Sequence, residues 1–161
     1  MIRKATLEDA PRIAALYSWY VMNGVESFET EPVSAAEMRR RMAATMPRWP
    51  YYVAEERGRV EGFCYAHPWK ERAAYCNTLE TTIYLSPSVQ RQGVGTALMR
   101  RLIADCRATG CRALIACITG ENTQSQAFHR RLGFEQVSLF RSVGYKMGRW
   151  LDVVDMELLL W

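Results

Sequence analysis

The run Gln90-Arg91-Gln92-Gly93-Val94-Gly95 has the residue types of an anion-binding turn. The residues before it, Thr81 to Leu85, are β-branched, aromatic or apolar and predict a strand, and the apolar spacing after it predicts a helix. A turn from a strand into a helix gathers unpaired backbone N–H groups at the positive end of the helix dipole, and its glycines let a ligand approach the backbone closely. The chemistry that such a turn offers is the binding of a phosphate or a pyrophosphate.

Two common nucleotide-binding motifs do not fit this turn. The dinucleotide fingerprint requires a small residue where Leu98 stands, and the P-loop requires a lysine, which is absent between Lys70 and Lys146. The pattern that fits is Q/R-x-x-G-x-G/A, the signature of the GNAT acetyltransferase superfamily, whose loop holds the pyrophosphate of acetyl-coenzyme A. Its loosely specified positions also fit an ordinary strand-to-helix turn, so the rest of the chain must decide between the two interpretations.

The composition predicts one ordinary domain over residues 1–161, with 49% apolar residues to build its core. The net charge of +4 is mild and the basic residues are scattered, so we expect no nucleic-acid surface. No apolar run is long enough to span a bilayer and no signal peptide is visible, which predicts a cytoplasmic protein without membrane contact. The five cysteines include no C-x-x-C pair, so neither a disulfide framework nor a metal site is expected.

Hydrophobic periodicity and turn residues predict the elements that hold the glycine turn in place. Thr6 with Asp9 and Ser34 with Glu37 resemble helix N-terminal caps, and Gly110 and Gly133 are expected to end later helices. The predicted order is β-α-α-β-β-β-α-β-α-β-β, an α+β fold on a mixed sheet, and it is also the order of the GNAT fold. Strands are expected over 2–5, 51–56, 60–67, 75–85, 113–118, 134–140 and 150–160, and helices over 6–23, 34–46, 94–110 and 123–132, with 144–148 as the connection between the last two strands.

Further runs of the chain resemble the phosphinothricin and methionine sulfoximine acetyltransferase family. They are Phe28-Glu-Thr-Glu-Pro32, Pro68-Trp-Lys-Glu-Arg72 with Ala74-Tyr75, the strand that contains Glu80, and Gly144-Tyr-Lys-Met-Gly-Arg-Trp150 with Asp152-Val153. These runs extend over most of the chain in the family's order. The second and the last are far more specific than the pyrophosphate signature.

The resemblance implies an enzyme that moves acetyl from acetyl-CoA to the α-amine of a small acidic amino-acid analogue by direct attack. Methionine sulfone would be a related acceptor. A protonated amine cannot attack a thioester, so a base is needed, and Glu80 matches the family's catalytic glutamate. The resemblance assigns backbone contacts with the pantetheine arm to Ile83, Tyr84 and Leu85, the pyrophosphate loop to Arg91, Gln92, Gly93, Val94, Gly95 and Thr96, and a further cofactor contact to Asn122.

The position seven residues after Asn122 holds His129, where many GNAT enzymes have a tyrosine that protonates the departing thiolate. The phosphinothricin branch shares this departure. Histidine can donate or accept a proton near neutrality, so His129 is a candidate acid or a second base. For the developing oxyanion, the backbone N–H of Leu85 is the candidate donor by family position.

The loop before the Glu80 strand supplies the expected acceptor site. By family position Lys70 and Arg72 face an acidic substrate, and arginine can grip a carboxylate or phosphinate with two parallel hydrogen bonds. Two solvated loop cations are the alternative interpretation. The other residues expected to line the acceptor pocket are Phe28, Glu71, Tyr75, Thr81, Thr82 and Tyr145, together with Glu80.

Two other functions stay open on the sequence. One keeps the cofactor site but makes a protein or peptide N-terminus the acceptor, and the other is a non-catalytic acyl-CoA-binding module. The cations at Lys70 and Arg72 favour a small acid over a peptide. The resemblance also implies a homodimer, with the apolar run Val153 to Trp161 and the Gly144 to Trp150 loop as contributors.

Overall fold

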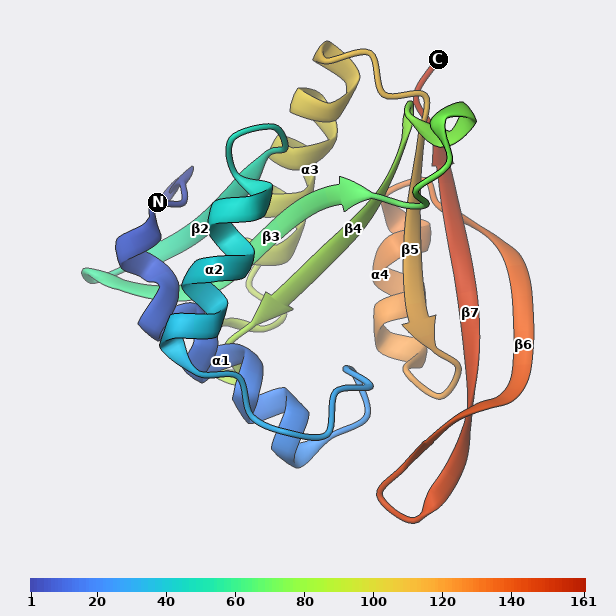
Figure 1. The fold of residues 1–161 in the computed structure, drawn as a ribbon, viewed down its shortest axis with the longest axis horizontal. Helices are drawn as coiled ribbons and strands as arrows, with labels where there is room; N and C mark the ends of the chain where they lie inside the picture. The colour runs from blue at the N-terminus through green and yellow to red at the C-terminus, as the bar shows by residue number, and fades with distance from the viewer.

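Seven strands form one mixed sheet in the order β1-β2-β3-β4-β5-β7-β6, and four α helices cover it (Figure 1). The computed structural model describes all residues from Met1 to Trp161. The strands are β1 (Ile2–Lys4), β2 (Tyr51–Glu56), β3 (Arg59–Pro68), β4 (Thr78–Leu85), β5 (Ala113–Thr119), β6 (Glu135–Lys146) and β7 (Arg149–Leu159). The helices are α1 (Ala10–Asn23), α2 (Ala35–Thr45), α3 (Val94–Ala108) and α4 (Thr123–Arg131). The predicted fold class and element order are confirmed.

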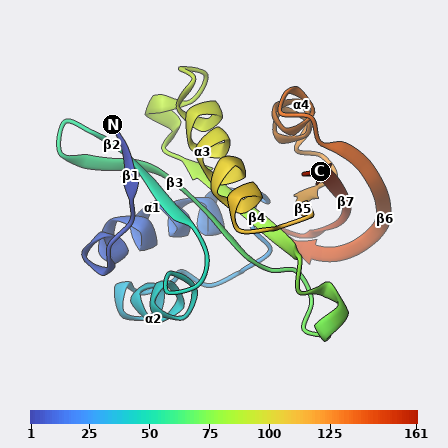
Figure 2. The ribbon, with the colours of Figure 1, turned by 90° about the horizontal axis from the view of Figure 1, so that it is seen from above.

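The sheet separates two layers of helices. Figure 2 shows α1 and α2 on one face and α3 and α4 on the other. The alternation of side chains along β2 follows from this arrangement, because Tyr51 and Val53 join the apolar cluster under α1 and α2, whereas Tyr52 and Ala54 join the cluster under α3. Both faces of β2 are therefore buried, and two hydrophobic cores hold this part of the sheet between them. None of the helices combines the length and the apolar character that crossing a membrane requires.

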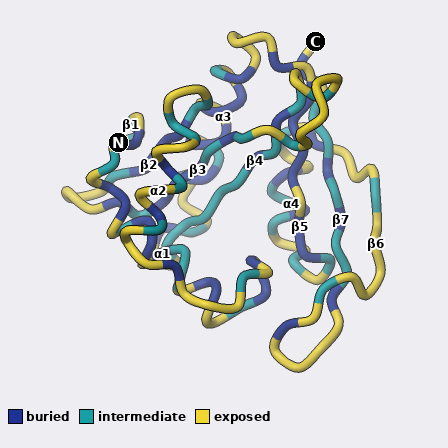
Figure 3. The backbone as a smooth tube through the Cα atoms, in the orientation of Figure 1, coloured by how far each residue is buried: buried dark blue, intermediate teal, exposed yellow.

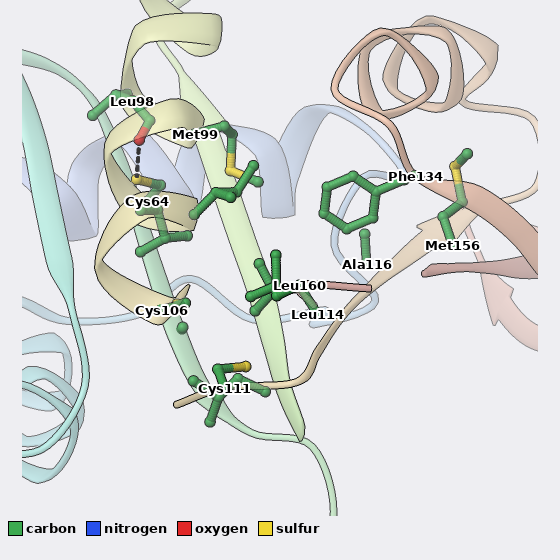
Figure 4. Close-up of a cluster of buried hydrophobic side chains, with 14 of the residues drawn as sticks. Cys64, Leu98, Met99, Cys106, Cys111, Leu114, Ala116, Phe134, Met156 and Leu160 are labelled. Atoms are coloured by element: carbon green, nitrogen blue, oxygen red, sulfur yellow. Dashed lines mark hydrogen bonds between the residues drawn. The ribbon is translucent and has the colours of Figure 1, made fainter. Parts of the chain in front are cut away.

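The hydrophobic core on the α3 side packs α3 against the sheet beside β4, the strand that leads into the glycine turn (Figure 4). Leu98, Leu102 and Leu114 are 0% exposed there. The Cys64 thiol lies among them and reaches the carbonyl oxygen of Leu98 at 3.6 Å. Cys64, Cys106 and Cys111 are buried and free, as expected for cysteines that act as small core residues.

The parallel pairing of β4 with β5 stops halfway along both strands. It covers Thr78 to Thr81 against Ala113 to Ala116, while β4 continues to Leu85 and β5 to Thr119. The two strands diverge beyond that point, as their arrowheads show in Figure 1. A gap thus opens within the sheet, directly before the turn that leads into α3.

Two predicted boundaries near the site are wrong. The segment Ala73–Tyr75 forms a 3₁₀ turn closed by the Tyr75 N–H on the Arg72 carbonyl at 2.9 Å, so β4 begins at Thr78 rather than at residue 75. The predicted connection 144–148 is mostly strand, because β6 continues to Lys146 and a tight hairpin forms at Met147 and Gly148, where φ is +51° and +76°.

The predicted helix caps are largely confirmed. Thr6 and Asp9 form a complete capping box, which opens a short 3₁₀ turn before α1. The Ser34 side chain accepts the Glu37 N–H at 3.1 Å. The other half of that predicted box does not form, since the Glu37 carboxylate binds Arg40 and Arg41 instead. Gly110 and Gly133 follow the ends of α3 and α4 with φ of +85° and +97°.

Candidate active site

A cleft of about 830 Å³ lies where β4 and β5 diverge. Its walls combine both sides of the sheet: the glycine turn and α4 on one side, and the segment after α1 on the other. The predicted site residues that line this cleft are Phe28, Glu80, Thr81, Thr82, Ile83, Tyr84, Leu85, Arg91, Gly93, Gly95, Thr96, Asn122 and His129. Most of the residues that sequence reasoning proposed for the cofactor and for the chemistry therefore meet at one place.

The backbone of β4 alternates between β3 and the cleft. At one end of the pairing between β3 and β4 the Ser86 N–H donates to the backbone carbonyl of Glu61, and at the other end the Trp69 N–H donates to the backbone carbonyl of Thr78. In an antiparallel ladder every second residue makes such bonds, so Tyr84 is bonded to β3, and Ile83 and Leu85 direct their N–H and C=O groups toward the β5 side. Because β5 has diverged there, these groups face the cleft. Of the three backbone contacts expected from the resemblance, the geometry thus offers the N–H and C=O of Ile83 and the N–H of Leu85, whose carbonyl already accepts from Tyr20.

The turn at Gly93 presents its backbone openly. Gly93 has φ of +83° and forms the N-terminal cap of α3, and no atom lies within 4 Å of the position that a Cβ would occupy. The first N–H groups of α3 have no partner within the helix, so they and the helix dipole favour an anion at this point. Gly95 is packed against Leu85 and Phe128, so an added Cβ would lie 3.1 Å from the Leu85 side chain and 3.3 Å from the Phe128 ring, and both would have to shift.

Glu80 lies half-buried on the face of the sheet that carries α1 and α2. It stands directly opposite His67 in the β3–β4 register, on the same face as the buried Phe63. Burial raises the pKa of the Glu80 carboxyl above its ordinary value, and the negative charge of Asp155 raises the pKa further, whereas the positive charge of His67 opposes the shift. A carboxylate with a raised pKa is a stronger base than an exposed glutamate, so the environment suits proton abstraction.

His129 lies on α4 and is only 3% exposed. Its Nδ1 is 2.8 Å from the carbonyl oxygen of Ser125. A carbonyl can only accept, so Nδ1 carries the proton and Nε2 holds the lone pair when the ring is neutral. Burial lowers the pKa of the imidazole, which favours that neutral form. This arrangement suits His129 as a proton acceptor better than as an acid.

Asn122 caps α4 at the edge of the cleft. Its Oδ1 accepts the Ser125 N–H at 3.1 Å, which fixes the side chain and leaves the amide group as a donor. The position fits the expected contact with the cofactor's arm. The same helix turn is held from inside by Gln126, whose Nε2 donates to the carbonyl of Gly120 at 2.9 Å.

Several predicted residues lie outside the cleft wall. Lys70, Glu71 and Arg72 are exposed in the loop before β4. The Lys70 ammonium lies 4.3 Å from the ring centre of Trp69 and 5.5 Å from that of Tyr75. Tyr145 is 60% exposed and packs against Trp150, and Gln92 and Val94 line a small separate cavity on the other side of the turn.

Some cleft residues have no signal in the sequence. Tyr20 donates from its hydroxyl to the Leu85 carbonyl at 2.5 Å and accepts from Gln90 at 2.8 Å, although its spacing only indicates a buried helix face. Cys117 lines the cleft on the same face as Glu80. Partial withdrawal from water and the carboxylates of Asp155 and Glu80 raise the pKa of the Cys117 thiol to about 12. The thiol therefore stays protonated and does not compete as a nucleophile.

The open N-terminus of α3 and the half-buried carboxylate of Glu80 line the same cleft in a mixed sheet, and the comparison with known proteins shows the class of protein. The model of the Acetyltransferase (GNAT) family matches residues 13–134, and the chain belongs to this family. It is an acetyltransferase, as the sequence resemblance predicted.

Several relatives of this chain are named for the acetylation of amino-acid analogues. This chain is 40% identical over 158 residues to a phosphinothricin N-acetyltransferase of Alcaligenes faecalis, and the match covers 97% of this chain and 80% of that protein. It is 35% identical over 160 residues to an L-methionine sulfoximine/L-methionine sulfone acetyltransferase of Pseudomonas aeruginosa, covering 98% and 92%. The crystal structure of a phosphinothricin acetyltransferase from Sinorhizobium meliloti in complex with AcCoA matches with a TM-score of 0.96 at 41% identity, covering 99% of this chain and 88% of that one.

Proposed function

We propose that this protein transfers acetyl from acetyl-CoA to the α-amine of a small acidic amino-acid analogue of the phosphinothricin or methionine sulfoximine and sulfone type. The observation that carries the proposal is the half-buried Glu80 in a cleft that also contains the open turn at Gly93. Identity of 40% with a phosphinothricin N-acetyltransferase supports the choice of acceptor.

The turn at Gly93 fits a pyrophosphate group. Its open approach, its free N–H groups and the exposed Arg91 supply an electropositive cradle. The backbone groups of Ile83 and Leu85 on the cleft side are suited to bind an extended amide-containing arm, as a further strand would. Acetyl-CoA, when bound there, supplies an activated thioester, and these residues hold it beside Glu80.

Proton transfer falls to Glu80. An α-amine is largely protonated at neutral pH, and the Glu80 carboxylate removes that proton either directly or through one water. The Leu85 N–H is a fixed donor on the cleft side of β4, available to stabilise the negative charge that develops during attack. His129, as a neutral ring with its lone pair on Nε2, is a second acceptor in the same cleft.

We assign recognition of the acceptor's acidic group to the loop of Lys70 and Arg72. Both are exposed and lie at the end of β4 nearest Glu80. Replacing Arg72 with glutamine should raise KM for an acidic acceptor by about tenfold and leave KM for acetyl-CoA unchanged, because one charge-assisted pair is lost. An unchanged KM for the acceptor would show that Arg72 is a solvated surface residue that does not bind the acceptor.

We further propose a cytoplasmic homodimer. Free cysteines throughout the chain fit a reducing compartment. The edge strand β6 and its hairpin partner expose large apolar side chains, and Figure 3 shows most of β6 in the exposed colour. Val143, Tyr145 and Trp150 are 57%, 60% and 66% exposed. Light scattering after size exclusion should give the dimer mass for the native chain and the monomer mass for Trp150→Asp.

The experiment that tests the activity is an acceptor screen with acetyl-CoA and a thiol-release readout. The panel contains phosphinothricin, methionine sulfoximine, methionine sulfone, a peptide with a free N-terminus and a polyamine. We expect kcat/KM for the acidic analogues to exceed that for the peptide by about a hundredfold or more. Turnover of the peptide alone would replace the proposed acceptor by a protein N-terminus, and acetyl-CoA binding without any turnover would leave only a binding module.

A further inference from the structure

Lys146 is a buried cation that the proposed chemistry does not use. It lies near the end of β6 and is only 6% exposed, although the residues around it in the hairpin are exposed. Its Nζ donates to the carbonyl oxygen of Ser27 at 2.6 Å, a contact between positions 119 residues apart in the chain. Burial lowers the pKa of this ammonium, and the carboxylates of Glu26 and Glu29 oppose that shift. A lysine kept in such a place requires an explanation.

The partner of Lys146 belongs to a wall of the cleft. Glu26, Ser27 and Phe28 line the cleft on the side of the sheet that carries α1 and α2, the side to which Glu80 also points. This segment has no helix or strand of its own. Its position therefore depends on contacts made with other elements.

Side chains from several elements hold this wall segment. Thr119 at the end of β5 donates from its hydroxyl to the Val25 carbonyl at 2.5 Å. The Tyr17 hydroxyl on α1 lies 2.7 Å from the Ser27 hydroxyl. From the β6–β7 hairpin, the Lys146 ammonium donates its hydrogen bond to Ser27, at the centre of the segment.

The hairpin also packs directly against the wall. A Cβ built on Gly144, two residues before Lys146, would lie 2.2 Å from the Cε2 atom of Phe28. The absence of a side chain at Gly144 therefore lets the Phe28 ring rest on the backbone of β6. Since neighbouring Cβ atoms alternate across a strand, Gly144 and Lys146 present the same face of β6 to residues 27 and 28.

From these contacts we infer that Lys146 and Gly144 are positioning residues for the acceptor. The hairpin fixes the Phe28 wall, Lys146 by a hydrogen bond to Ser27 and Gly144 by making room for the ring, and so sets the shape of the acceptor side of the cleft. The inference rests on the proposed function in taking this side of the cleft as the acceptor's. It does not involve the turn at Gly93, which lies on the other side of the sheet.

The test compares Lys146→Met with Arg141→Met on the same strand, where the native arginine is exposed. We expect Lys146→Met to raise KM for the acceptor by about tenfold or more while KM for acetyl-CoA stays within about twofold, because only one side of the cleft loses its support. Arg141→Met should change neither value. Gly144→Ala should reproduce the acceptor effect without removing any charge.

Amide hydrogen exchange gives a readout that does not depend on turnover. Residues 25–29 should exchange at least about tenfold faster in Lys146→Met than in the native chain or in Arg141→Met, while α3 and its preceding turn keep native protection. Should the native enzyme fail to acetylate any acidic analogue, the proposed acceptor is wrong, and the exchange experiment still decides the role of Lys146. Native exchange in 25–29, an unchanged acceptor KM, or an equal rise of both KM values would overturn the inference. If Lys146→Met does not fold, Gly144→Ala carries both measurements.

Discussion

Replacing Glu80 with glutamine removes the group that we assign as the base and keeps its volume. Loss of a positioned general base costs about 10²–10⁴ in rate, equivalent to roughly 3–5 kcal/mol of transition-state stabilisation. The half-buried position and the nearby Asp155 make the upper part of that range the expectation, because both raise the pKa of the carboxyl and so its strength as a base. Acetyl-CoA should bind to the variant with unchanged affinity, since the turn at Gly93 is intact.

The assay measures kcat/KM for the preferred acceptor as a function of pH, and the rate is monitored by the release of the CoA thiol. The native enzyme should lose activity as the pH falls through the raised pKa of Glu80, and Glu80→Gln should lack this acidic limb. The variant should also unfold at a higher temperature than the native protein at pH 8. The ionised carboxylate is disfavoured in the fold, a cost that is present above the folded pKa and absent below the pKa of the unfolded chain. A variant within about threefold of native activity would refute the assignment of Glu80 as the base.

Three further substitutions test the electrostatics, the turn and the core. His67→Gln removes the positive charge that lowers the pKa of Glu80, so the acidic limb of the kcat/KM profile should move to higher pH; a shift to lower pH would contradict the arrangement. Gly95→Val crowds Leu85 and Phe128, whose side chains would lie 3.1 and 3.3 Å from an added Cβ, and should raise KM for acetyl-CoA by about tenfold with the acceptor KM unchanged. Leu114→Ala empties a position that is 0% exposed and should lower the free energy of unfolding in urea by about 2–5 kcal/mol, and a loss below 1 kcal/mol would show that the core collapses around the gap.

Local sequence signals predicted most of the fold, because each depends on neighbouring residues. The strand, the glycine turn at Gly93 and the following helix were predicted from hydrophobic periodicity and glycine alone, and the structure has all three. The Ser34 cap was read from a spacing of three residues. The strand start at Thr78 was missed because the preceding turn is closed by backbone bonds that any residue types there can make.

The length of β6 was missed for a different reason. Gly144 and Gly148 both indicate a turn in the sequence, but only Gly148 lies in one, with φ of +76°. Gly144 pairs with Leu151 inside the hairpin, and its lack of a side chain serves the ring of Phe28 instead. A glycine needed for packing and a glycine needed for a turn look alike until the distant partner is known.

The cleft itself has no local signature, because it depends on where β4 and β5 stop pairing. That divergence leaves the backbone groups of Ile83 and the N–H of Leu85, which a continued parallel pair would bond, facing the cleft. It also lets a carboxylate from one face of the sheet and a helix N-terminus from the other line the same cleft. The sequence can supply Glu80 and Gly93 separately, through the family resemblance and the turn pattern. The two residues line one cleft because the pairing of β4 with β5 stops at Thr81 and Ala116. Substitutions that extend this pairing should therefore close the cleft without changing Glu80 or Gly93.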